Sequence, residues 1–387
     1  MDTKDITKVD IHTNLNVFPT SKKSSKVIEA TIEEMVAFEK LNGIGVNLVL
    51  YPRDGYDALV ELDKANPDCQ HIGVQVLMGI DANDATDMVN LELDVNDPNK
   101  SFVNGGLCYG IKIASHRGWW LRKGVVNSGM CYGNGDGSQI NKWLKSMPEG
   151  AICSMHMQGD PINNSASIPT QVGWYAHRHH DKKFIVNHCG DFGQGGFSNK
   201  PKKYNTVMKT RGLCYFPAYR HAHAIGIVDS AVAIANTMHN VLLDTSVHYP
   251  YKAEAMARCN QWAIGSDYPF LVKEGKKDTS KLFIQQEDLF KRDVGEDKVN
   301  EAHKRTYEWL TNSMAKLKKD SEWYDGEDKE EWLAYAIDQE HLPMTSKEKE
   351  EWSNMSKEER NEHKRAAKKA PKPSKGSSQS KLEDLFS

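Results

Sequence analysis

Residues 44–77 read IGVNLVLYPRDGYDALVELDKANPDCQHIGVQVL and contain one complete strand–helix–strand unit. The runs IGVNLVLY (44–51) and HIGVQVL (71–77) are almost continuously apolar, as expected for strands buried on both faces. Between them, DGYDALVELDKANP (54–67) has a helical pattern that begins at Asp54 and ends before Pro67. Two buried strands joined by a helix predict a parallel pair in an α/β sheet.

The same unit recurs along most of the chain. Helical patterns also occupy 24–43, which ends on the C-cap signal Asn42-Gly43, and 223–240. The eight strand-like runs are 7–12, 44–51, 71–77, 109–114, 151–157, 183–188, 240–246 and 261–267. Eight alternations predict a (β/α)8 barrel, a fold that often takes about 250 residues. A doubly wound open sheet remains the alternative, because periodicity alone does not separate the two.

The chain has 387 residues, of which 39% are hydrophobic and 27% are charged, so a large hydrophobic core is possible. The formal net charge of −3 gives no reason to expect nucleic acid as a partner of the whole chain. None of the seven cysteines forms a C-x-x-C pair, which predicts buried free thiols in a reducing compartment. The polar N-terminus and the lack of a long apolar run predict a soluble cytoplasmic protein without a membrane span.

Charge patterning divides the chain into three parts. Residues 1–315 hold the strand–helix alternation and are predicted to form the barrel. Residues 316–363 are strongly charged, with capping-box signals, and predict a helical extension. Residues 364–387 begin with a basic stretch containing proline, glycine and serine, which predicts a disordered linker.

Polar residues stand at the carboxyl ends of several predicted strands. They are His12, Lys112, His156, His188 and Asp267. Barrel enzymes build their active sites at this rim. Imidazoles and a carboxylate are ligands for Zn²⁺, Fe²⁺ or Mn²⁺, so the rim is a candidate metal site.

At these positions the chain resembles the amidohydrolase superfamily, in particular its amidohydrolase-related branch of hydrolases and decarboxylases. The matching segments are VDIHTN (9–14), GIKI (110–113), SMH (154–156), VNHCG (186–190), NVLLDTS (240–246) and IGSDYPF (264–270). They occur in the family's order and span roughly residues 7–312. The resemblance implies a metal-dependent enzyme on a barrel.

That resemblance also assigns roles to individual residues. His12, His156 and Asp267 would bind one divalent metal, with Zn²⁺ expected first and Mn²⁺ or Fe²⁺ as alternatives. Asn14 stands where the family has a second histidine ligand, and an amide oxygen binds Zn²⁺ less well than imidazole. His188 would be a ligand, a substrate contact or the general base. Asp267 would also orient or deprotonate the attacking water.

Residues around the fourth predicted strand are candidates for substrate binding. Lys112 would contact the substrate at the rim or form a buried ion pair, with a carbamylated metal bridge as the alternative. His116 and Arg117 follow the same strand and would line the pocket. The cluster His177–His180 precedes the sixth strand, away from the rim, and predicts a solvated helix face.

The last nine residues, QSKLEDLFS, resemble the short peptide that docks on DNA sliding clamps. Gln379, Leu382, Leu385 and Phe386 match its pattern of one glutamine and three apolar residues. The apolar three would share one face of a helical turn and fill a pocket on the clamp.

Taken with the rim residues, the resemblance predicts a hydrolase of a C–N or C–O bond in a small polar substrate, using metal-activated water. A metal-dependent decarboxylase of the same family is one alternative. The other is a barrel with reduced catalysis that acts as a binding module, tethered to a sliding clamp by its terminal peptide.

Overall fold

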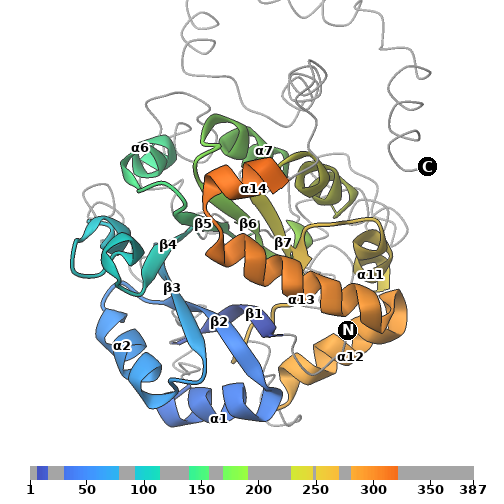
Figure 1. The fold of residues 1–387 in the computed structure, drawn as a ribbon, viewed down its shortest axis with the longest axis horizontal. Coiled ribbons are helices and arrows are strands. Elements are labelled where there is room, and N and C mark those ends of the chain that lie inside the picture. Colours follow the sequence, from blue (N-terminus) through green and yellow to red (C-terminus); the bar gives the residue numbers. More distant parts are fainter. Residues whose placement is uncertain are drawn as a thin grey trace, which may run out of the picture.

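Eight parallel strands form one sheet in sequence order, β1-β2-β3-β4-β5-β6-β7-β8 (Figure 1). The computed structural model describes residues 7–15, 30–77, 92–113, 139–156, 169–190, 228–246, 250–269 and 280–320. The strands are β1 (Lys8–Asn14), β2 (Ile44–Tyr51), β3 (Gln70–Leu77), β4 (Cys108–Ile113), β5 (Ile152–Met155), β6 (Lys183–Val186), β7 (Val241–Asp244) and β8 (Trp262–Ala263). All eight predicted strands are confirmed.

The sheet closes on itself between β1 and the segment that follows β8. The backbone N–H of Ile11 donates to the carbonyl of Ile264 at 3.1 Å, and that of Asp267 donates to His12 at 2.7 Å. Thr13 also forms a parallel bridge with Tyr268. The structure is therefore a nearly closed barrel, and the alternative of a doubly wound open sheet is wrong.

Helices surround the sheet in the predicted alternation. They are α1 (Ile32–Asn42), α2 (Tyr56–Ala65), α6 (Gln139–Ser146), α7 (Pro169–Arg178), residues 228–237, α11 (Pro250–Ala257), α12 (Leu282–Val294), α13 (Glu296–Thr311) and α14 (Met314–Asp320), with short 3-10 turns η3 (Asp94–Asn96), η4 (Phe102–Asn104) and η6 (Asn187–Gly190). Helix α1 ends at Gly43 in the left-handed region (φ 64°), as predicted. It begins later than predicted, because Thr31 and Glu34 form a capping box that fixes its first turn.

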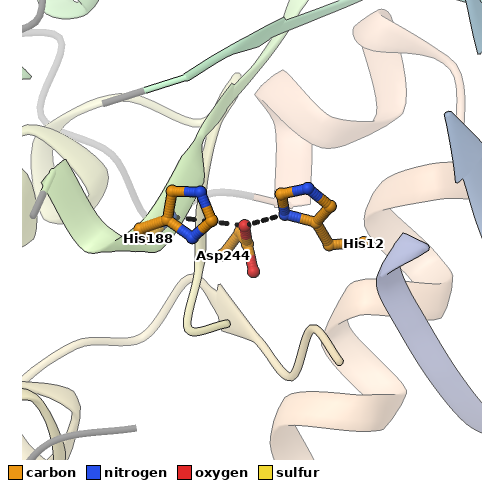
Figure 2. A group of neighbouring side chains, drawn as sticks. All are labelled: His12, His188 and Asp244. Carbon is orange, nitrogen blue, oxygen red and sulfur yellow. Dashed lines mark hydrogen bonds and ion pairs between the residues drawn. The ribbon is translucent and has the colours of Figure 1, made fainter. Parts of the chain in front are cut away.

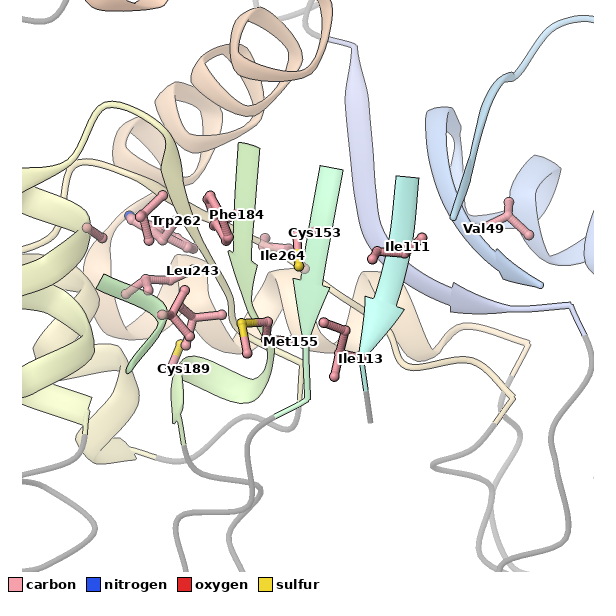
Figure 3. Close-up of a cluster of buried hydrophobic side chains, with 14 of the residues drawn as sticks. Val49, Ile111, Ile113, Cys153, Met155, Phe184, Cys189, Leu243, Trp262 and Ile264 are labelled. Atoms are coloured by element: carbon pink, nitrogen blue, oxygen red, sulfur yellow. The ribbon is translucent and has the colours of Figure 1, made fainter. Parts of the chain in front are cut away.

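Alternate residues of the strands belong to two separate apolar layers. Phe184, Leu243 and Trp262 pack between the strands and the surrounding helices (Figure 3). Ile185 and Leu242 instead join a second cluster, which contains one residue or more from every strand except β4. Side chains alternate across a strand, so the second cluster fills the inside of the barrel.

Helix α13 covers the amino-terminal end of the barrel. Its residues Trp309 and Leu310 belong to the interior cluster. Lys183, at the start of β6, donates from Nζ to the carbonyls of Leu310 at 2.8 Å and Asn312 at 3.0 Å. Because α13 closes the amino-terminal end of the barrel, the opposite end, at the carboxyl ends of the strands, is where a site can form.

Five cysteines fall in the described ranges, namely Cys69, Cys108, Cys153, Cys189 and Cys259, and all are buried free thiols as predicted. Among the helices of these ranges, none has the length and apolar content needed to cross a membrane. The predicted charged extension beyond residue 320 and the linker lie outside the described residues.

Candidate active site

A layer of polar side chains lies above the apolar interior at the carboxyl ends of β5, β6 and β7. Two residues beyond Ile185 and Leu242, the inward positions are Asn187 and Asp244. Ser154 Oγ donates to Asn187 Oδ1 at 2.9 Å, and Asn187 Nδ2 donates to Asp244 Oδ2 at 3.1 Å. The layer therefore ends on a buried carboxylate at the tip of β7.

Asp244 lies between the rings of His12 and His188 (Figure 2). Its Oδ2 is 2.6 Å from Nδ1 of His12 and also accepts from the Ser246 hydroxyl at 2.8 Å and the backbone N–H of His188 at 3.3 Å. Burial alone would raise the pKa of Asp244, but its contact with His12 and the hydrogen bonds that it accepts hold that pKa well below its usual range. Because Asp244 is an ionised acceptor, Nδ1 of His12 carries the proton, and its Nε2 keeps a lone pair.

The same reasoning fixes the tautomer of His188. The Ser246 hydroxyl gives its proton to Asp244, so Ser246 Oγ accepts from Nδ1 of His188 at 2.7 Å. Burial lowers the pKa of His188 well below its ordinary value, which keeps the ring neutral. Nε2 of His188 therefore carries a lone pair as well. Asp244 and Ser246 together orient both rings through Nδ1, so that Nε2 of each histidine points away from the polar layer.

Two side chains lie at Nε2 of His12, and a third holds one of them in place. Asp267 Oδ1 lies 3.3 Å from this nitrogen, and Lys112 Nζ lies 2.8 Å from it. Asn14 donates from Nδ2 to Asp267 Oδ1 at 3.1 Å and to the carbonyl of Tyr268 at 3.3 Å. Asn14 thus holds the carboxylate that follows β8 in place.

His156 follows β5 and lies against His188. Its Nδ1 is 3.2 Å from Nε2 of His188, and the two rings are edge to face with centroids 4.8 Å apart. His156 is partly exposed, whereas His12 and His188 are each 1% exposed. Nδ1 of His188 therefore contacts Ser246, and Nε2 of the same ring faces His156.

Unusual backbone geometry marks two of these residues. His188 (φ 57°) and Asp267 (φ 53°) are left-handed, which costs free energy for residues other than glycine. The only other such residue in the described ranges is Cys189, the neighbour of His188. Strained backbone of this kind gathers at functional sites, where it sets the direction of a side chain.

Gly265 allows the strand ends to approach one another. A Cβ atom at this position would lie 2.3 Å from Asp244 Oδ1 and 2.9 Å from Cβ of His12. Both distances are shorter than van der Waals contact, so a side chain here would push β1, β7 and β8 apart. The glycine of the segment IGSDYPF therefore has a packing reason that the sequence alone did not supply.

Two pairs of donor atoms have the spacing expected of two ligands on one metal. Two ligands at about 2.0–2.1 Å from a tetrahedral Zn²⁺ lie about 3.3 Å apart. The pair His156 Nδ1 and His188 Nε2 is 3.2 Å apart, and the pair His12 Nε2 and Asp267 Oδ1 is 3.3 Å apart. The hydrogen bonds from His12 to Asp244 and from His188 to Ser246 supply the outer contacts that orient metal-binding histidines.

Asp244 is close enough to be a ligand but is already engaged. One donor atom each of His12, His188 and Asp244 lie within 4.8 Å of one another. However, Oδ2 of Asp244 accepts four hydrogen bonds and Oδ1 accepts the Ser246 N–H at 2.8 Å. We therefore assign Asp244 to orienting the histidines.

A second group of this kind, Glu39, Cys69 and His71, lies among α1, α2 and β3. There His71 donates from both nitrogens, to Glu39 and Asp63 at 3.0 Å each. Glu39 also accepts from Asn47 and Asn66, both at 2.7 Å. These groups satisfy one another, and burial raises the pKa of the Cys69 thiol, so we interpret the group as structural.

Burial and neighbouring charges have opposite effects on the pKa values of Asp267 and Lys112. Burial raises the pKa of Asp267, and the nearby His12 and Lys112 partly counter that rise. Burial lowers the pKa of Lys112 to about 8, although Asp267 and Asp244 favour its charged form. A carboxylate with a raised pKa is a better proton acceptor than an ordinary aspartate.

Of the residues singled out from the sequence, the structure brings together His12, Asn14, Lys112, His156, His188 and Asp267. His116, Arg117 and the four residues of the terminal peptide lie outside the described residues. In the cluster before the sixth strand, His179 is buried against Asn141, so the predicted solvated face is wrong at that position.

Asp244 and Ser246 lie in the segment NVLLDTS (240–246), but the sequence alone predicted no role for either residue. The available signal was the one used for Asp267, a carboxylate at the carboxyl end of a strand.

Comparison with known proteins finds matches in structure only: no family model and no curated protein matches the sequence. A probable 2-pyrone-4,6-dicarboxylic acid hydrolase from Acinetobacter baumannii matches with a TM-score of 0.43 and 10% identity, over 78% of this chain and 98% of that one. An organophosphorus hydrolase variant from Deinococcus radiodurans gives 0.38 and 12%, over 81% and 95%. D-hydantoinase gives 0.27 and 10%, over 64% and 49%.

These neighbours are members of the amidohydrolase superfamily, which the sequence motifs resemble. At identities of 10% and 12% they leave the substrate and the chemistry to be argued from this chain's own residues.

Proposed function

We propose that this chain is a metal-dependent hydrolase that cleaves a C–N or C–O bond in a small polar molecule. One observation carries the proposal: the Asp244–Ser246 pair leaves a lone pair on Nε2 of both His12 and His188. Nε2 of His12 faces Asp267 and Lys112, and Nε2 of His188 faces His156. Imidazoles that are oriented in this way through their other nitrogen are typical of metal-binding histidines.

The residues that would hold the metal are His12, His156, His188 and Asp267. Three imidazoles and one carboxylate favour Zn²⁺, with Mn²⁺ and Fe²⁺ as alternatives. When bound there, a divalent ion supplies a Lewis acid and lowers the pKa of water from about 15.7 to about 7. The 3.2 Å spacing from His156 supports a ligand role for His188 over the roles of base and substrate contact.

Asp267 is the residue best placed to handle a proton. Its carboxylate is held by Asn14 on one side and faces His12 on the other, so its orientation is fixed before a substrate arrives. Burial raises its pKa, which strengthens it as a base. We infer that Asp267 orients the attacking water and accepts its proton, and that Lys112, with His116 and Arg117, contacts the substrate.

The test is a panel of amides, cyclic amides, esters and lactones, assayed with protein loaded with Zn²⁺ or Mn²⁺ and with chelated protein. Hydrolysis predicts incorporation of one oxygen from labelled water into the product, and loss of activity on chelation. Release of carbon dioxide without oxygen incorporation would identify a decarboxylase instead. Asp267→Asn should remove activity in either case.

As a separate property, we propose that the terminal peptide docks on a DNA sliding clamp. Support comes from sequence alone: Gln379, Leu382, Leu385 and Phe386 fit the docking pattern and follow a basic linker. Burying three such side chains is worth about 1.5–3 kcal/mol each before the cost of ordering, which predicts roughly micromolar affinity. Calorimetric titration of a peptide covering 371–387 against the clamp tests this. Equal binding by a Leu385→Ala, Phe386→Ala peptide, or no binding at all, would show that the match is accidental.

A further inference from the structure

Lys112 is a buried lysine that points at the candidate metal site from β4. The residue is 7% exposed, and its Nζ lies 2.8 Å from Nε2 of His12. The Asp244 contact places the proton of His12 on Nδ1, so Nε2 accepts and the amine of Lys112 donates. The lone pair on Nε2 of His12 therefore already accepts a hydrogen bond from a side chain of the same protein.

A metal at this site and the amine of Lys112 would both use the lone pair on Nε2 of His12. A zinc ion would approach Nε2 of His12 to about 2.0–2.1 Å along the lone pair. One lone pair cannot serve both a metal and an N–H donor at hydrogen-bonding distance. An ammonium group this close would also repel a divalent cation, with little solvent to screen the repulsion.

The carboxylates around His12 explain why a positively charged side chain lies at this position. Asp267 lies 3.3 Å from the same nitrogen of His12, and Asp244 lies 2.6 Å from the opposite nitrogen. Both carboxylates are buried, and buried charges are costly unless a charge of opposite sign accompanies them. Lys112 supplies that charge without any metal.

Because both groups would contact Nε2 of His12, we propose that Lys112 is a built-in counter-cation of this site. It competes with the metal for His12 and must leave that nitrogen before the metal binds. This inference rests on the proposed metal site. It assigns Lys112 a positioning role that sets metal affinity, in contrast to a carbamylated lysine, which would itself be a metal ligand. The two roles predict opposite effects when the amine is removed.

The experiment measures Zn²⁺ affinity by competition with a chromogenic chelator, for wild type and Lys112→Met, with folding checked by circular dichroism. Methionine has a similar length and no charge or donor, so we expect Zn²⁺ to bind at least tenfold more tightly. The matched control is Lys183→Met, which removes the buried lysine at the other end of the barrel. Its Zn²⁺ affinity should equal that of wild type.

A second variant and a second measurement guard against a folding defect. Lys112→Gln keeps a polar group and should shift affinity in the same direction. Zn²⁺ should also raise the melting temperature of either variant more than that of wild type, because the metal replaces the missing positive charge.

Each outcome separates this inference from the proposed function. Equal affinity in wild type and the Lys112 variants would overturn the competition and leave the metal site intact. Weaker binding in the variants would overturn it as well and make Lys112 a ligand. Absence of Zn²⁺ binding in all proteins would overturn both the competition and the metal site.

Discussion

Nδ1 of His12, in β1, lies 2.6 Å from the carboxylate of Asp244, at the end of β7. This contact orients the ring of His12 and turns its Nε2 toward Lys112 and Asp267 at the carboxyl end of the barrel. The chemistry proposed for the site depends on that orientation.

Replacing Asp244 should weaken metal binding although it is not assigned as a ligand. Asp244→Asn keeps the shape but removes the charge that holds the proton on Nδ1 of His12. Loss of an orienting partner of this kind typically costs about ten- to hundredfold in metal affinity. Chelator competition measures the change, with Asp94→Asn as the control for losing a buried carboxylate elsewhere. Unchanged affinity in Asp244→Asn would show that the contact is only structural.

His188→Asn should lower the metal content of the purified protein, because its Nε2 faces His156 at the spacing of two ligands on one metal. Elemental analysis of the variant is the measurement. If the metal remained near one equivalent while turnover on an identified substrate disappeared, His188 would be the general base. Ser246→Ala should give a milder loss of metal, because it removes only the hydroxyl that accepts from His188.

Placing a histidine at position 14 should tighten metal binding. Asn14 now donates to Asp267 from the end of β1, so an imidazole there would lie beside the same carboxylate. Asn14→His is therefore expected to bind Zn²⁺ more strongly than wild type in the same chelator assay. Asn14→Ala, which neither ligates nor donates, should bind more weakly. Similar affinities for all three proteins would mean that position 14 does not touch the metal site.

Acid should destabilise the barrel through His179. This residue is buried with Nε2 2.8 Å from Asn141 Oδ1, and burial lowers its pKa from 6.5 to about 4. The unfolded chain takes up a proton below about pH 6.5, whereas the folded state resists it until about pH 4. Between these values the unfolded state binds more protons, so the free energy of unfolding falls as the pH falls.

Urea titrations at several pH values in that window test the effect of His179. His179→Gln should flatten the fall in stability, and the exposed neighbour His180 provides the control in His180→Gln. An equally steep fall in His179→Gln and wild type would remove His179 as the cause.

The sequence predicted the eight strands because each is a short, apolar, β-branched run that needs burial on both faces. It placed the ends of four strands two or more residues too late. The predicted runs 151–157, 183–188, 240–246 and 261–267 shrink to β5, β6, β7 and β8, since the last residues leave the sheet to form the site. His188 and Asp267 adopt left-handed backbone there, which no propensity of histidine or aspartate specifies.

Site residues were predictable where position and side-chain chemistry coincide, as for His12, His156 and Asp267. The pairing of Asp244 with His12 joins residues 232 positions apart in the sequence, so only the closed barrel reveals it. The contact of Lys112 with His12 is likewise a product of folding. The sequence predicted the candidate ligands, and the structure added the contacts that orient them.

The central claim is that this barrel binds one divalent metal through His12, His156, His188 and Asp267. The most direct test is elemental analysis of the protein purified after growth with added Zn²⁺ or Mn²⁺. The account predicts about one equivalent in wild type, a clear loss in Asp267→Ala, and no loss in His71→Gln, which alters the second His–carboxylate group. Absence of metal from folded wild-type protein under both growth conditions would contradict the account.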